Sequence, residues 1–106
     1  MAKRRIDKDI LESINRYLEK LSKYYRIDAV YLFGSYANGT PREDSDIDLA
    51  IVSRDVTDRL EDMGRMLGYT WKCDTRIEPH PYNTNDFSPN EYMLVGEILR
   101  TGIKVA

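Results

Sequence analysis

Two aspartates one residue apart could hold a metal ion. Asp46 and Asp48 open an apolar run that continues through Val52. Short apolar runs bounded by turn-forming residues are typical of buried strands. Side chains of a strand alternate between its faces, so the two carboxylates point the same way, about 6 to 7 Å apart at their Cα atoms. Such a pair repels unless a cation lies between, and Mg²⁺ suits one or two carboxylates together with substrate phosphates. Solvated residues at a strand edge are the alternative.

A Gly-Ser turn precedes this pair and could hold a phosphate. The apolar run Val30–Phe33 breaks at Gly34 and Ser35. A Gly-Ser pair that leaves a strand exposes backbone N–H groups and a hydroxyl, which are suited to bind phosphate oxygens. A phosphate site beside a divalent metal site is the arrangement that phosphoryl or nucleotidyl transfer requires. The two motifs together therefore favour the metal interpretation of the aspartates.

The spacing of the two motifs resembles that of a known superfamily. Gly34-Ser35, then ten residues, then Asp46-x-Asp48 is similar to the signature of DNA polymerase β-type nucleotidyltransferases. Because the chain has only 106 residues, it most resembles the minimal nucleotidyltransferases, known as MNT proteins. These are typically encoded beside a HEPN-domain protein as the antitoxin of a toxin–antitoxin pair. The resemblance implies an α/β fold, a small mixed β-sheet flanked by helices that is similar to the polymerase β palm.

The resemblance also implies an activity and a partner. It implies a Mg²⁺-dependent protein adenylyltransferase that moves AMP from ATP to a tyrosine of a partner HEPN RNase toxin, which this AMPylation inactivates. In such a site Asp46 and Asp48 hold Mg²⁺, with two ions expected, and Gly34 and Ser35 hold the β- and γ-phosphates. The alternative is a non-catalytic antitoxin that neutralises its partner by occlusion. A small-molecule adenylyltransferase would need added helices for its acceptor.

Two residues of the intervening loop are further candidates for nucleotide binding. Arg42 occupies a position where members of the superfamily commonly carry arginine, and it could contact a phosphate. A solvated loop arginine is an equal alternative. Ser45, directly before Asp46, could orient that carboxylate by a hydrogen bond.

A third carboxylate completes the metal site in the superfamily and commonly acts as the general base. The segment 71–78 alternates in polarity, which predicts a strand with Asp74 and Glu78 on the same face. The spacing alone does not choose between them. We favour Glu78 as the catalytic metal ligand, because minimal members of the superfamily often place the acidic residue at a strand end. Asp74 remains the alternative.

The single histidine and the single cysteine are expected to lie outside the site. His80 stands between Pro79 and Pro81 in a segment, 79–87, that is predicted as an irregular loop. A lone histidine in such a loop is usually exposed and inert. Because no second histidine or partnering cysteine accompanies it, we expect no zinc site. Cys73 cannot form an intramolecular disulfide and is predicted to be a buried thiol.

The remaining elements follow from periodicity and turn chemistry. Apolar residues at helical spacing predict a helix over 6–25 and another over 58–67 with Asp55 or Thr57 as its cap. Ser88-Pro89-Asn90-Glu91 predicts the start of a further helix that ends at Gly102. Strands are expected at 29–33 and 46–53, a short helical turn at 36–37, and a last short strand at 103–105.

Composition bounds the class of protein. The length predicts a single domain over 1–106, and the net charge of −2 provides no broad basic field, so direct nucleic-acid binding is not expected. No apolar run approaches the roughly 18 residues of a membrane span. The basic start of the chain lacks the apolar stretch of a signal peptide. We therefore expect a cytoplasmic protein without a membrane partner.

Overall fold

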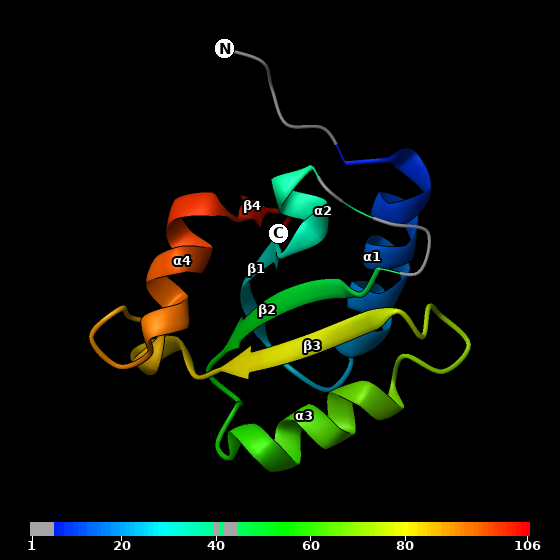
Figure 1. The fold of residues 1–106 in the computed structure, drawn as a ribbon. Coiled ribbons are helices and arrows are strands. Elements are labelled where there is room, and N and C mark those ends of the chain that lie inside the picture. Colours follow the sequence, from blue (N-terminus) through cyan, green and yellow to red (C-terminus); the bar gives the residue numbers. More distant parts are fainter. Residues whose placement is uncertain (1–5, 40, 42–44) are drawn as a thin grey trace.

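The strands form one small mixed sheet. The computed structural model describes residues 6–39, 41 and 45–106. Within these residues the strand order is β3-β2-β1-β4 (Figure 1). The strands span β1 Ile27–Phe33, β2 Ile47–Ser53, β3 Ile77–Tyr82 and β4 Ile103–Lys104. β1 runs antiparallel to β2 and β4, whereas β2 and β3 are parallel. This confirms the predicted α/β fold with a mixed sheet.

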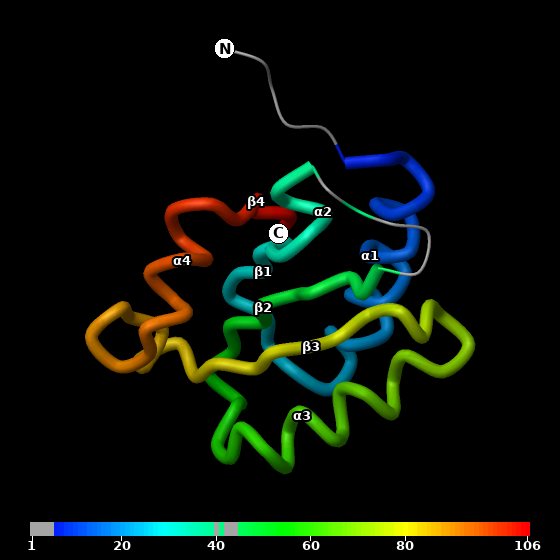
Figure 2. Tube along the Cα trace, in the orientation of Figure 1, coloured from blue at the N-terminus to red at the C-terminus, as the bar shows by residue number. Residues whose placement is uncertain are grey.

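Helices cover the two faces of the sheet unequally. Their bounds are α1 Lys8–Leu21, α2 Ser35–Asn38, α3 Arg59–Gly68 and α4 Met93–Thr101, with a 3₁₀ turn, η1, at Thr84–Asp86. Side chains of α1 and α3 share one core cluster with the sheet, and side chains of α4 share another. Figure 2 shows the short α2 following β1 directly, near the start of β2. No helix within the described ranges has the length and apolar character needed to cross a bilayer.

The alternation of side chains along β2 separates the core from the candidate site. Ile47, Leu49 and Ile51 are fully buried in the cluster that α1 and α3 cover. Ala50 points to the other face, where it packs in the cluster that contains Ile98 of α4. Asp48 lies on this second face as well, because it is two residues from Ala50 in the strand. The strand therefore holds the carboxylate of Asp48 in a defined place outside the main core.

The third strand lies later in the chain than predicted. The prediction of a strand over 71–78 was wrong, since residues 71–76 form turns and β3 begins at Ile77. Lys72 has a φ of +68°, and the Arg76 N–H donates to Asp74 Oδ1 at 3.0 Å. Trp71 is 71% exposed. The alternating polarity of this segment therefore reflects a turn closed by Asp74 rather than a pleated strand.

Strand β3 instead runs through the segment that was predicted as a loop. Pro79 and Pro81 both lie within it, opposite Leu49 and Ile51 of β2. Proline removes a donor from a sheet and is tolerated only where its nitrogen faces away from the neighbouring strand. β3 satisfies this condition because it is an outer strand of the sheet. The prolines predicted a loop, but a strand forms because it lies at the edge of the sheet.

Two helix starts also differ from the prediction. α4 begins at Met93 after an N-cap at Tyr92, and the predicted start at Ser88 is a turn whose Ser88 carbonyl accepts the Glu91 N–H at 3.0 Å. α3 is capped by the side chain of Asp58, which accepts from the N–H groups of the first turn. Asp55, one of the two predicted caps, instead pairs with Arg26. The predicted end of α4 at Gly102 and the short last strand are confirmed.

Candidate active site

Gly34 places the Gly-Ser turn against the first carboxylate. It follows β1 with a φ of +76°, a conformation that side chains with a Cβ rarely adopt. A Cβ atom at this position would overlap with Oδ2 of Asp48. The register of the sheet brings the two together, because Phe33 at the end of β1 pairs with Asp48. The turn and the aspartate therefore form one continuous surface, and that surface requires glycine.

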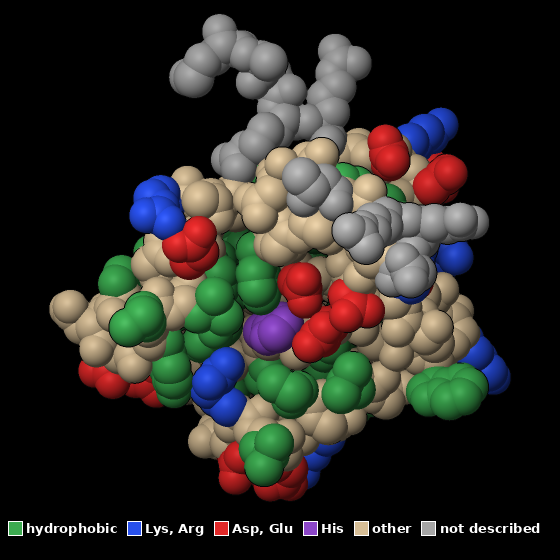
Figure 3. Space-filling model, in the orientation of Figure 1, with side chains coloured by type: hydrophobic (Ala, Val, Ile, Leu, Met, Phe, Trp, Pro, Cys, Tyr) green, Lys and Arg blue, Asp and Glu red, His purple; other side chains and the backbone are tan. Residues whose placement is uncertain are grey.

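The second carboxylate of the site comes from the parallel neighbour of β2. Asp48 and Glu78 are direct partners in the register of β2 and β3. Asp48 is half-buried, and the side chain of Glu78 is 46% exposed. Asp46, just before β2, is exposed. Figure 3 shows acidic side chains gathered beside the single histidine on this face of the molecule. The structure therefore brings Asp46, Asp48 and Glu78 close to one another, and their role as metal ligands stays a prediction.

The surroundings of Glu78 raise the pKa of its carboxyl group. Burial raises the pKa of Glu78, and the negative charge of Asp48 raises it further. His80 acts in the opposite direction, and Asp46 adds to the increase through a side-chain hydrogen bond and its charge. A carboxyl whose pKa lies above its usual range accepts a proton more readily than an ordinary surface glutamate. That property suits a general base.

His80 is part of this cluster, contrary to the expectation of an exposed and inert loop residue. Its Nε2 lies 3.3 Å from Asp48 Oδ1 and 3.8 Å from Glu78 Oε1, and the side chain is only 18% exposed. The ring packs edge-on against Phe33 with centroids 4.9 Å apart. One signal was available in the sequence, since Glu78-x-His80 repeats the spacing of Asp46-x-Asp48. The flanking prolines concealed it.

The cluster has the dimensions of a site for one divalent cation. Asp48, Glu78 and His80 each offer one ligand atom, and these atoms lie within 4.8 Å of one another. Ligand atoms around an octahedral ion with bonds near 2.1 Å are separated by roughly 3 to 4 Å. Small side-chain adjustments would therefore bring the three atoms onto one ion. Asp46, on the same side, could contribute a further oxygen.

The other predicted site residues take different places. Asp74 forms a 2.7 Å ion pair with Arg76, which lowers the pKa of Asp74 and holds it in the turn before β3, so the structure does not bring it into the cluster. Ser35 is the first residue of α2, and Ser45 is half-buried just before Asp46. Arg42 lies outside the described residues.

Two proteins with assigned names are similar to parts of the chain. A protein of Methanocaldococcus jannaschii, MJ1215, whose name describes it provisionally as a protein adenylyltransferase, is 32% identical over 53 residues. The protein adenylyltransferase MntA of Shewanella oneidensis is 43% identical over 35 residues. These matches cover 50% and 33% of the chain, but they span only 62% and 25% of the two relatives.

Solved structures share the fold. A crystal structure of a toxin–antitoxin with AMP-PNP has a TM-score of 0.58 at 22% identity, and the match covers 91% of this chain and 72% of that one. A mutant of the toxin–antitoxin MntA–HpeT has a TM-score of 0.56 at 22% identity and covers 87% and 71%.

The match to a protein family is the most extensive of these comparisons. Residues 12–105 match the family described as polymerase beta, nucleotidyltransferase. The match includes the Gly-Ser turn, the two aspartates and the whole sheet that positions them. The chain belongs to the polymerase beta nucleotidyltransferase family.

Proposed function

We propose that this chain is an antitoxin that transfers AMP from ATP to a hydroxyl of a partner toxin and so inactivates it. The observation that carries the proposal is the contact of Gly34 with Asp48, since the turn that we propose to bind phosphate lies against a carboxylate of the cluster. Family membership supports nucleotidyl transfer, and the relatives named protein adenylyltransferases support a protein acceptor. The fold shared with toxin–antitoxin structures supports a toxin as the partner.

The carboxylates would hold the divalent ions of the reaction. The oxygen-rich cluster of Asp46, Asp48 and Glu78 fits Mg²⁺, with two ions expected. Bound there, the metal supplies positive charge that neutralises the developing charge of the triphosphate. Gly34 and Ser35 would bind the β- and γ-phosphates through backbone N–H groups and the hydroxyl. Arg42 and Ser45 are proposed to add contacts to the nucleotide.

Glu78 would act on the acceptor. As the acceptor oxygen attacks the α-phosphorus of ATP, the hydroxyl proton passes to the carboxylate of Glu78. The bond between the α-phosphorus and the bridging oxygen breaks, and pyrophosphate leaves. The position of Glu78 supports this role, because it lies directly beside Asp48 in the register of β2 and β3 and its side chain is 46% exposed. We propose a tyrosine of a HEPN RNase toxin as the acceptor.

Intact-mass spectrometry of the partner tests the proposal. The protein encoded beside this chain is incubated with the chain, ATP and Mg²⁺, and its mass is expected to increase by one or more AMP units. Peptide mapping should locate the added mass on tyrosine. The increase should disappear when Asp46→Asn and Asp48→Asn are combined and should persist in Asp86→Asn, which changes an exposed aspartate of η1. A stable complex without any gain in mass would instead support neutralisation by occlusion.

A further inference from the structure

We propose that His80 is a direct ligand of the metal ion, so that the site combines oxygen and nitrogen ligands and binds transition metals such as Mn²⁺ more tightly, relative to Mg²⁺, than a site of carboxylates alone would. This inference rests on the metal-binding part of the proposed function. It concerns which ion the site selects, and it does not depend on the identity of the acceptor.

The geometry directs one ring nitrogen at both carboxylates. His80 Nε2 lies 3.3 Å from Asp48 Oδ1 and 3.8 Å from Glu78 Oε1. Both separations fall within the range of roughly 3 to 4 Å expected for ligands of one ion with bonds near 2.1 Å. A hydrogen bond to Asp48 would engage only the nearer carboxylate. An ion between the three atoms would engage both.

The ring is held in this orientation by its surroundings. His80 lies on β3 opposite Ala50, a small residue that is fully buried. Phe33 packs against the imidazole with an angle of 63° between the two ring planes. Proline precedes and follows His80, which fixes the backbone φ on both sides. A ligand that is already positioned loses little conformational freedom when it binds an ion.

The charge of the cluster calls for a cation that the described residues do not provide. Among residues 6–39, 41 and 45–106, His80 is the only basic side chain in an ion pair with Asp48 or Glu78. A single imidazole cannot balance three neighbouring carboxylates. Imidazole nitrogen favours transition metals, whereas Mg²⁺ prefers oxygen ligands. A histidine among these carboxylates therefore raises the affinity of the site for transition metals relative to Mg²⁺.

Electron paramagnetic resonance with Mn²⁺ can detect the proposed bond directly. The sequence contains one histidine, so in tag-free protein an imidazole nitrogen bound to Mn²⁺ can come only from His80. Electron spin echo envelope modulation of the Mn²⁺ protein should show coupling to ¹⁴N. His80→Gln, which keeps a neutral hydrogen-bond donor, should remove the coupling. Bound Mn²⁺ without ¹⁴N coupling in the wild-type protein would overturn the proposal, and that result requires no variant to fold.

Equilibrium affinities provide the second measurement. Calorimetry should show that His80→Gln weakens Mn²⁺ binding by about tenfold or more, at least the loss that follows removal of an outer-shell partner. Mg²⁺ binding should change less, so the ratio of the two affinities falls. Glu78→Gln should weaken both ions and leave the ¹⁴N coupling in place. An unchanged ratio in a folded His80→Gln protein would reduce His80 to a residue that only positions Asp48.

These outcomes are separable from those of AMP transfer. The ¹⁴N coupling and the affinities are measured without ATP or a partner. If the coupling is present but the partner gains no mass, the proposed function fails and the metal ligand stands. If the partner gains AMP while the coupling is absent, the proposed function stands and the assignment of His80 fails.

Discussion

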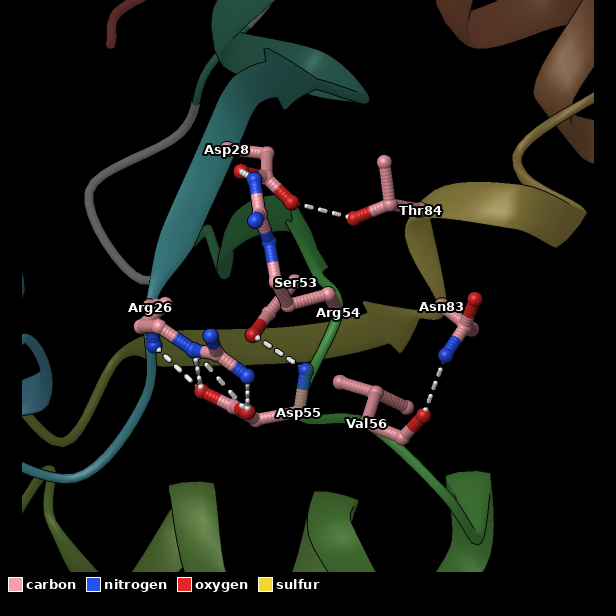
Figure 4. A network of polar contacts seen from close by, with 8 residues as sticks. All are labelled: Arg26, Asp28, Ser53, Arg54, Asp55, Val56, Asn83 and Thr84. Carbon is pink, nitrogen blue, oxygen red and sulfur yellow. Dashed lines mark hydrogen bonds and ion pairs between the residues drawn. The ribbon is translucent and has the colours of Figure 1, made fainter.

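The two ends of the central strands use carboxylates in opposite ways. At the end where β2 finishes, Asp55 receives two N–H groups of the Arg26 side chain and the Arg26 backbone N–H, and Asp28 pairs with Arg54 at 2.9 Å. Figure 4 shows this network, in which Thr84 also donates to Asp28. At the end where β2 starts, the carboxylates of the candidate site face one another.

The pKa values of carboxyl groups are shifted in opposite directions at the two ends. Hydrogen bonds from Arg26 lower the pKa of Asp55 to about 2, and a hydrogen bond from Arg54 lowers that of Asp28. Burial and neighbouring carboxylates raise the pKa of Glu78. Carboxylates at the far end are thus paired with arginines of the protein, whereas Glu78 lies beside another carboxylate. The comparison therefore favours the end where β2 starts as the place where the proposed metal ion binds.

The largest expected effect separates activity from stability at the two ends. Combining Asp46→Asn with Asp48→Asn should reduce AMP transfer by about a thousandfold or more, because metal stabilisation of the transition state is worth several kcal/mol. The midpoint of thermal unfolding should stay the same or rise, since repulsion between carboxylates is relieved. Combining Asp28→Asn with Asp55→Asn should lower the midpoint and leave transfer intact. Loss of transfer in the second double variant would contradict this division.

A second prediction concerns Gly34 and a matched glycine. Gly34→Ala should destabilise the protein by about 1 to 3 kcal/mol, because the residue must adopt a positive φ and its Cβ would overlap with Asp48. Displacement of Asp48 should also reduce AMP transfer. Gly39 has nearly the same φ, +75°, but among the described residues no atom lies within 4 Å of a Cβ there. Gly39→Ala should therefore cost about 1 to 2 kcal/mol from backbone strain alone and preserve transfer. Chemical denaturation and the mass assay measure both effects.

The two ends should also differ in how stability depends on pH. The pKa of Asp55 is lowered from 3.8 to about 2. The ionised Asp55 therefore makes its full contribution to the free energy of unfolding above pH 3.8, and this contribution is lost as the pH falls towards 2. Asp55→Asn should therefore destabilise the protein at neutral pH and have no effect below about pH 2. Urea denaturation across this range measures the difference. A destabilisation independent of pH would mean that the ion pair is not its cause.

Glu78 should show the opposite dependence in protein treated with a chelator. Its pKa is raised above 4.5 in the folded state, so the native protein binds the proton more strongly, and the stability that this proton contributes is lost as the pH rises from 4.5 through the higher pKa of the folded state. Glu78→Gln should accordingly stabilise the metal-free protein at neutral pH and have little effect below pH 4.5. Addition of Mn²⁺ should reverse the order of stabilities at neutral pH, because the wild type binds the ion more tightly.

The smallest effect is expected from an exposed ion pair of the far end. Arg54→Gln should lower the unfolding midpoint only slightly, because the Arg54 side chain is largely exposed and solvent screens the pair. In 1 M salt the difference between the variant and the wild type should disappear, since the screening length is then about 3 Å. A difference that persists at high salt would indicate a role for Arg54 in packing.

Some parts of the site could be predicted from sequence because they depend on local spacing. Gly34, Asp46 and Asp48 lie at the ends of two strands that are antiparallel neighbours, so their separation along the chain determined their proximity in space. The amphipathic helices α1 and α3 were predicted for a similar reason, because their apolar spacing is a local property. Phosphate and nucleotide contacts of Ser35, Arg42 and Ser45 remain predictions.

Other parts depended on the sheet as a whole. Glu78 joins the cluster because β3 pairs in parallel with β2, and that pairing sets which acidic residue faces Asp48. Asp74 was an alternative only because its turn was mistaken for a strand. His80 was missed because proline on both sides indicates a loop, whereas an outer strand tolerates both. Sequence periodicity contains no information on whether a strand is outermost in its sheet.

The prolines of β3 also restrict how other chains can approach the protein. Neither Pro79 nor Pro81 has a backbone N–H, so these positions on the outer edge of the sheet present no donor to an incoming strand. Strand addition by a partner, or by a second copy of the chain, is therefore disfavoured along β3. The same residues that made this segment resemble a loop thus protect it from aggregation through its exposed edge.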